Sequence, residues 1–314
     1  MATRTAAESK TRAVEKPAAQ SWLITSHLRR HLTGWLFILP ALIVYLVIVV
    51  YPVIYSVLLS FHTWSGFEPQ WGPFVGLKNY VDLTRDPIFV KATTNNFLFV
   101  GIRTPFEVGI ALLLALLLNA EIRGRWLIRT LIFVPVVLSL IVVGVVFGRI
   151  YEPNVGILNT FLHQVGLGFL AQQWLGDVRI SLLSVTAVSV WKNVGFSMVI
   201  LLAGLQGTPQ DVLDAARVDG AGPIQAVWNV TIPLLRPVIG ITIVLSIIGG
   251  LKVFDLVYIM TQGGPLYSTE VLTTYLYRVT FVLNQVGLGS SISVMLMLFV
   301  LVISWVQIRV LRND

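Results

Sequence analysis

The chain has 314 residues, of which 56% are hydrophobic and only 12% are charged, and its mean hydropathy is +0.82. Soluble domains carry about 25% charged residues, so lipid must cover much of the apolar surface of this chain. Cysteine is absent, which excludes a disulfide framework and thiolate metal sites. The net charge of +7 is compatible with nucleic-acid binding, but the positions of the basic residues indicate membrane orientation instead.

The chain begins with a polar, basic segment, residues 1–33, that lacks an apolar core. We therefore expect a cytoplasmic N-terminal tail there and no cleavable signal peptide. The apolar run at 34–61 predicts the first membrane span, in which Pro40 and Pro52 should produce kinks that membrane helices tolerate. This span is expected to pack either in the same rigid core as the others or across a partner subunit.

Five further apolar runs follow, each near the about 20 residues that a membrane helix requires. A short surface helix is expected between the third and fourth spans. The chain is therefore predicted to be an all-α polytopic membrane protein with six transmembrane helices, in one membrane domain over residues 34–314. The five further spans are expected at 93–118, 131–150, 180–205, 238–260 and 288–310.

Six spans place both termini on the same side of the membrane. Lys and Arg are about twice as frequent on the side of the termini, the 121–129 turn and the polar segment 206–237 as on the other side. The positive-inside rule therefore predicts that the termini and this polar segment are cytoplasmic.

The polar segment 206–237 is rich in Gly and Pro and stands between two apolar runs. Thr208 and Asp211 lie three residues apart, with Pro209 at the first helical position, which is typical of a capping box at a helix start. This helix should end at Gly220, because glycine readily adopts the left-handed cap conformation.

A second short helix in the same segment is expected to begin at Pro223. Pro233 and Pro237 should prevent its simple continuation into the next span. The segment is thus predicted to be a bent pair of short amphipathic helices, too polar for lipid and too ordered for a linker.

Within this pair, Asp214-Ala215-Ala216 is followed by Gly220 and, after nine further residues, by Val230-Thr231-Ile232-Pro233. The pattern resembles the EAA loop of the permease subunits of ATP-binding-cassette (ABC) importers, whose form is E-A-A-x-x-x-G, nine residues, I-x-L-P. The chain departs from that form by Asp for Glu, Val for Ile and Ile for Leu. An ordinary interfacial helix pair is the alternative interpretation.

The resemblance implies that segment 206–237 is a cytoplasmic coupling helix that fits a cleft of a separate ATPase subunit. The residues that it implies for this contact are Asp214, Ala215, Ala216, Asp219, Gly220, Val230, Ile232 and Pro233.

Residues for chemistry on ATP are missing from the sequence. No lysine follows a glycine, so the chain lacks the Gly-Lys step of a phosphate-binding Walker A loop. We expect no enzyme activity, no catalytic residues and no cofactor in this chain, and ATP hydrolysis in a partner. His27 and His31 lie four residues apart, but a solvated or headgroup-facing pair is a better interpretation than a metal site.

Charged side chains inside membrane spans are costly and usually face protein or a watery cavity. Arg103 and Glu107 lie four residues apart on the second span and should form an internal ion pair near its outer end. Lys192 on the fourth span is expected to neutralise Asp255 on the fifth.

Polar, glycine and aromatic residues gather on the fourth and fifth spans. Gly249 and Gly250 should thin the fifth helix and allow close approach or local unwinding. Sugars require hydrogen-bonding side chains and aromatic rings that cover the apolar faces of the pyranose, and these spans offer both. This favours a solute cavity over helix packing with one buried salt bridge. The residues concerned are Trp191, Lys192, Asn193, Ser246, Gly249, Gly250, Lys252, Phe254, Asp255 and Tyr258.

The stretch IGGLKVFDLVYIMTQGGP resembles the F-D…T-x-G-G-P segment of maltose-type carbohydrate-importer permeases, and the likeness extends over nearly the whole chain after the tail. It implies a MalF-like member of a permease pair. Side chains differ from the maltose type at several of the implied sugar-contacting positions, so the location of the site carries over and the identity of the sugar does not. Those positions are Ser189, Lys192, Asn193, Ser246, Gly249, Gly250 and Val253.

The resemblance therefore implies a permease subunit of a bacterial ABC carbohydrate importer in the cell membrane. Its implied partners are a MalG-like second permease in a heterodimer, an ABC ATPase dimer, an extracellular or periplasmic solute-binding protein, a carbohydrate and membrane lipid, with no nucleic acid. Two alternatives stay open: an ABC permease for glycerol-3-phosphate or a polyol, and an ion-coupled secondary transporter.

Overall fold

The computed structural model describes residues 35–68, 70–120 and 122–312, and the prediction for the tail, residues 1–33, lies outside them. The predicted all-α class is confirmed: within these ranges the only β contact is a bridge between His62 and Phe74. The chain divides into two units, residues 1–55 and 56–314.

The first predicted span is confirmed as a helix over Trp35–Leu59. One wide π-helical turn, η1 (Leu46–Val50), interrupts it just before α2 (Tyr51–Leu59). Pro52 follows this turn at once and has no N–H to donate to the carbonyl of Ile48. The wider turn relieves that conflict, so the helix continues through the proline.

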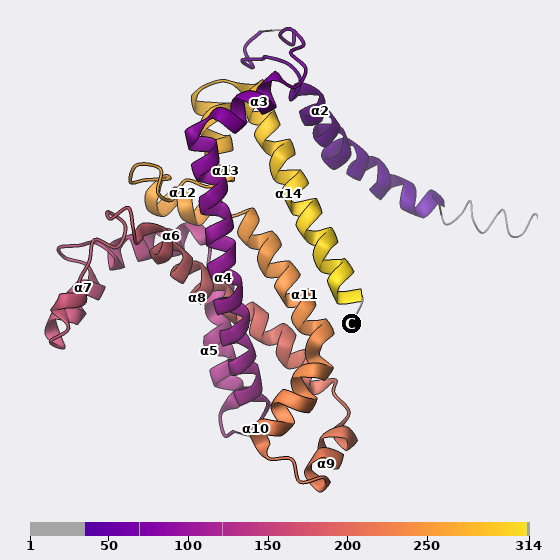
Figure 1. The fold of residues 1–314 in the computed structure, drawn as a ribbon, viewed down its shortest axis with the longest axis vertical. Coiled ribbons are helices and arrows are strands. Elements are labelled where there is room, and N and C mark those ends of the chain that lie inside the picture. Colours follow the sequence, from indigo (N-terminus) through magenta and orange to yellow (C-terminus); the bar gives the residue numbers. More distant parts are fainter. Residues whose placement is uncertain (1–34, 69, 121, 313–314) are drawn as a thin grey trace, which may run out of the picture. The chain divides into compact units, whose positions relative to one another are not determined.

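The second unit is built on four long helices, α4 (Pro87–Asn119), α8 (Ser181–Gln206), α11 (Ile232–Leu251) and α14 (Val286–Arg312). Of these, α4, α8 and α14 confirm the predicted second, fourth and sixth spans. In Figure 1, α4, α8 and α11 run beside one another, and α4 packs on both of the others.

Small side chains on α4 allow its close packing against α8. Ala111 and Ala115 are completely buried against Met198 and Leu201 of α8. In lipid, helices associate through such close contacts because lipid tails are as apolar as the side chains, so the hydrophobic effect does not drive the helices together.

The helix α4 begins six residues before the predicted start of the second span. The Asp86 side chain accepts a hydrogen bond from the Ile88 N–H at 2.8 Å, and Pro87 occupies the first helical position. This is a complete helix cap, so the helix starts there although the residues that follow are not yet uniformly apolar.

The predicted third span, 131–150, is not one continuous helix. Residues 125–150 form α5 (Arg125–Val137) and α6 (Leu140–Ile150), which meet at 98°. The second helix packs on α12 (Asp255–Thr261), where Gly144 lies so close to Ile259 that an added Cβ would be 2.8 Å from its Cγ2. Packing against α12, and not a glycine at the junction, therefore accounts for the bend between α5 and α6. The described chain has five helices long and apolar enough to cross a membrane, or six if this pair counts as one.

The predicted fifth span, 238–260, is also wrong at its end. Helix α11 stops at Leu251, and a separate helix, α12 (Asp255–Thr261), begins after a three-residue break. The Thr273 hydroxyl donates to the carbonyl of Val253 in that break, which satisfies a backbone group that has left the helix.

The second unit also contains several short helices. The helix expected between the third and fourth spans is present as α7 (Ile157–Gln164). The other short elements outside the loop between α8 and α11 are α3 (Lys78–Arg85), η2 (Gly168–Leu170), α13 (Leu272–Tyr277) and η4 (Arg278–Val282).

Candidate functional site

The polar segment between α8 and α11 forms the bent helix pair that its sequence predicts. Helix α9 (Gln210–Val218) ends at Gly220, whose φ is +84°, and the Ala221 N–H donates to the Ala216 carbonyl at 3.0 Å. This hydrogen bond completes a left-handed helix cap of the kind in which glycine is preferred. The predicted stop at Gly220 is confirmed.

The predicted start of α9 differs in detail. The helix begins at Gln210, and the Thr208 hydroxyl donates back to the carbonyl of Gly204 at 3.4 Å. This threonine side chain therefore helps to close the end of α8, where carbonyl groups lack helical partners.

Pro233 does not stop the second short helix, contrary to prediction. α10 (Pro223–Ala226) continues through the π turn η3 (Val227–Thr231) into α11, and Pro223–Leu251 is one helix of 29 residues. The Ile232 N–H reaches the Val227 carbonyl across this wide turn. The turn makes room for the proline ring, which would otherwise collide with the preceding turn.

The two halves of the EAA-like motif lie together, because α9 packs against η3. Asp214, Ala215, Asp219 and Gly220 are exposed on the α9 side. The remaining residues of the motif are half-buried: Ala216 of α9, and Val230, Ile232 and Pro233 of the second half.

Large apolar side chains project from this element without cover from the described chain. Val218 is 87% exposed, Ile224 76% and Trp228 66%. Figure 1 shows α9 and α10 at the opposite end of the second unit from α3 and α13. An exposed apolar platform at one end of a bundle is typical of a protein contact surface.

A buried polar network connects α4, α8 and α11. Arg103 and Glu107 form the predicted ion pair at 2.9 Å, and Glu107 also accepts hydrogen bonds from Ser197 of α8 at 2.7 Å and Ser246 of α11 at 3.0 Å. The pair lies halfway along α4, so its predicted place near the outer end is wrong. Additional hydrogen bonds are what a buried ion pair needs to offset the loss of hydration.

The predicted close approach at the two glycines is confirmed. A Cβ on Gly250 would lie 2.9 Å from Val100 Cγ2, and one on Gly249 would lie 3.3 Å from Arg103 Nη1. Arg103 also donates to the Ser246 carbonyl at 3.0 Å. The glycines thus leave room for a guanidinium between α4 and α11. Sequence reasoning missed Ser197, although a serine five residues from a mid-span charge, Lys192, is a usable signal.

The predicted Lys192–Asp255 ion pair is wrong. Lys192 Nζ donates to the Val136 carbonyl at 3.1 Å, and Asp255 is exposed at the first position of α12. The last carbonyl groups of α5 have no helical donors and carry the negative end of the helix dipole, so they attract an ammonium group. The bend between α5 and α6 brings this helix end to Lys192.

The remaining predicted sugar positions fall into separate groups. Asn193 donates to the carbonyl of Ser189 at 2.8 Å on its own helix, α8. Tyr258 belongs to a group of four aromatic rings, in which it stacks on Phe254 at 5.2 Å and meets Tyr277 edge-on at 5.2 Å. Phe281 joins this group through Tyr277 at 5.5 Å. Tyr277 and Phe281, which complete this group, were not anticipated from sequence.

Comparison with known proteins identifies the family. The chain matches the family described as binding-protein-dependent transport system inner membrane component over residues 107–312. The chain belongs to this family.

Named relatives of this permease cover almost its whole length. It is 38% identical to the probable ABC transporter permease protein YurN of Bacillus subtilis, over 89% of this chain and 96% of the relative. It is 33% identical to the trehalose/maltose transport system permease protein MalF of Thermococcus litoralis, over 89% and 93%. The predicted family of sugar-type ABC permeases is confirmed.

The fold of the permease is also shared with a solved structure. A bacterial alginate ABC transporter in complex with alginate pentasaccharide-bound periplasmic protein matches with a TM-score of 0.78 at 22% identity, over 90% of this chain and 94% of that chain. The predicted ABC importer permease fold of a multi-pass membrane protein is thereby confirmed.

Proposed function

We propose that this permease passes a carbohydrate across the bacterial cell membrane, with a second, MalG-like permease, after an extracellular binding protein delivers it. A separate ATPase dimer supplies the energy through segment 206–237. The sugar named for the Thermococcus litoralis relative and the saccharide-bound periplasmic protein of the alginate transporter support this substrate class and this route of delivery. The termini are cytoplasmic, on the side of the ATPase.

The observation that carries the proposal is the continuous helix Pro223–Leu251. One end of it is the exposed platform with Ile224 and Trp228, and the other end carries Gly249 and Gly250. A continuous helix moves as one body, so a pull on the platform reaches the glycine end directly. The polar network around Arg103 joins α4 and α8 to the same helix, which would make the three helices move together.

The aromatic residues beside the break that follows α11 favour a sugar. Phe254, Tyr258 and Tyr277 present half-buried rings there. Aromatic rings match the C–H faces of a pyranose.

Two measurements test the proposal. An affinity tag on the full chain in its native membrane should recover an ATPase and a second permease. Right-side-out vesicles that contain ATP and are supplied with the binding protein should take up a neutral sugar such as trehalose, maltose or lactose. Recovery without any ATPase would favour an ion-coupled transporter. Uptake of glycerol-3-phosphate or a polyol, with no sugar, would replace the carbohydrate.

A further inference from the structure

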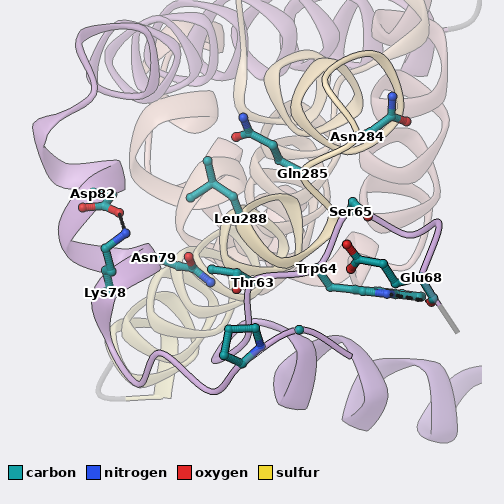
Figure 2. Close-up of a pocket in the computed structure, with 12 residues that line it drawn as sticks. Thr63, Trp64, Ser65, Glu68, Lys78, Asn79, Asp82, Asn284, Gln285 and Leu288 are labelled. Atoms are coloured by element: carbon teal, nitrogen blue, oxygen red, sulfur yellow. Dashed lines mark hydrogen bonds and ion pairs between the residues drawn. The ribbon is translucent and has the colours of Figure 1, made fainter. Parts of the chain in front are cut away.

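A cavity of about 420 Å³ opens at the end of the second unit that carries α3 and lies opposite α9 and α10 (Figures 1 and 2). Small-molecule sites in proteins span roughly 300–1,000 Å³, so this cavity is large enough for a sugar unit. The loop after α2, helix α3 and the turn before α14 form its walls. Its lining residues are Thr63, Trp64, Ser65, Glu68, Gly72, Pro73, Lys78, Asn79, Asp82, Asn284, Gln285 and Leu288.

Backbone contacts hold the walls in place without a ligand. The Thr63 N–H donates to the Pro73 carbonyl at 3.2 Å, and the Gly287 N–H at the start of α14 donates to the Trp64 carbonyl at 3.1 Å. A Cβ on Gly287 would lie 2.0 Å from the carbonyl oxygen of His62, so only glycine permits this approach. The buried Asn79 amide donates to two backbone carbonyls of the same loop. The cavity is therefore preformed.

The lining offers the chemistry that a sugar ring requires. Trp64 is the one aromatic residue of the lining, and its Nε1 donates to the Glu68 carbonyl at 3.2 Å, which fixes the indole ring. Figure 2 shows the side chains of Asn284 and Gln285 on another wall. Amides both donate and accept hydrogen bonds, as hydroxyl groups of sugars do, and an indole face covers an apolar ring face.

The charges of the lining exclude an anionic ligand. Among the described residues of the lining, the only cation is Lys78, which pairs with Asp82 at 3.3 Å, and Glu68 adds a second carboxylate. A phosphate or uronic acid would face a net negative wall, whereas a neutral hydroxyl-rich ligand carries no such penalty.

We propose that this cavity is an outer binding site for a neutral mono- or oligosaccharide, which holds the sugar before it enters the membrane path. The inference rests on the proposed function for the class of solute and for the outward orientation of this end. A sugar that leaves the binding protein and is held in this cavity stays at high local concentration near the membrane path.

The absence of cysteine from the chain permits a direct test. Ser65→Cys and Gln285→Cys place single thiols on two walls of the cavity, and Leu283→Cys places one on an exposed residue of the same turn outside the lining. Each variant, in the full transport complex in membrane vesicles, is labelled with a membrane-impermeant maleimide in the presence of trehalose, maltose, lactose or glycerol-3-phosphate.

A neutral sugar of this panel should slow the labelling of both cavity thiols by about tenfold at a concentration ten times its dissociation constant, and leave Leu283→Cys unchanged. In the Ser65→Cys background, Trp64→Ala should raise the sugar concentration for half-maximal protection about threefold to tenfold, and Trp64→Phe should raise it less.

Three results would overturn the outer site: no protection by any sugar, equal protection of the Leu283→Cys thiol, or protection by glycerol-3-phosphate alone, which would contradict a site for neutral sugars. Sugar uptake by the same vesicles reports separately on the proposed function. Uptake without protection removes the outer site alone, and protection without uptake removes the transport proposal alone.

Discussion

Arg103 on α4 donates a hydrogen bond to the backbone carbonyl of Ser246 on α11 at 3.0 Å, although both residues are buried inside an apolar bundle. The Ser246 hydroxyl in turn donates to Glu107, the ion-pair partner of Arg103. The two helices are thus connected in both directions by one charged pair. In a setting that disfavours charge, this arrangement is stable only while each member has its partners.

Glu107→Leu should destabilise the permease by about 3–5 kcal/mol, because it leaves the Arg103 guanidinium buried without its counter-charge. Replacing both residues by Leu should cost clearly less than the sum of the two single changes. Denaturant unfolding of the purified complex gives the four values of this cycle. Strict additivity would mean that the pair is not coupled.

Gly250→Ala should cost about 1–3 kcal/mol, since the new methyl group would lie 2.9 Å from Val100 Cγ2 and force α4 and α11 apart. Gly101→Ala on α4 is the matched control, because a Cβ there meets nothing within 4 Å. That change should stabilise the helix slightly. Equal unfolding midpoints for both variants would show that the helix contact is looser than described.

Gly220→Ala should lower sugar uptake per ATP hydrolysed while the protein stays in the membrane. A non-glycine residue at a φ of +84° is strained by about 1–2 kcal/mol, which would shift the orientation of α9. Asp214→Lys should act in the same direction by reversing a charge on the predicted ATPase contact. Gly222→Ala is the control, since φ is −65° there and a Cβ meets no atom. Normal coupling in the Gly220 variant would remove the cap from the mechanism.

Trp228→Ala should weaken recovery of the ATPase by about thirtyfold or more if this exposed ring is a central contact, since such residues contribute about 2 kcal/mol or more to interfaces. The unfolding midpoint of the permease should not change, because the ring is 66% exposed. Leu113→Ala removes a similarly exposed apolar side chain from the side of α4 and should leave ATPase recovery intact. Equal loss in both variants would point to a general effect on the membrane domain.

Glu270, between α12 and α13, should make stability depend on pH. Burial raises the pKa of this carboxyl group, and the Arg278 guanidinium at 2.7 Å opposes the rise without cancelling it. A raised folded-state pKa means that the stabilising contribution is complete below the unfolded pKa of about 4.3 and is lost as pH rises through the folded pKa.

Glu270→Gln should therefore gain unfolding temperature relative to the natural protein as pH rises from acid to neutral, because the amide cannot ionise in the buried site. Thermal unfolding across that pH range measures the difference. A difference that stays constant, or that shrinks as pH rises, would contradict the assignment.

The sequence alone determined the membrane class, the place of the long helices and the bent segment with its stop at Gly220, because these depend on apolar length and on local backbone preference. The EAA-like motif around Asp214 and Gly220 was equally recognisable in the sequence. Each of these features concerns residues that are close along the chain.

Only the tertiary structure decided which partner each buried polar group takes. Lys192 bonds to a helix end rather than to Asp255, because packing of α6 on α12 bends the chain after Val137 and presents an unpaired carbonyl. The outer cavity likewise depends on contacts between residues near 64 and residues near 287. Such choices follow from which surfaces approach in three dimensions, and no local pattern encodes that approach.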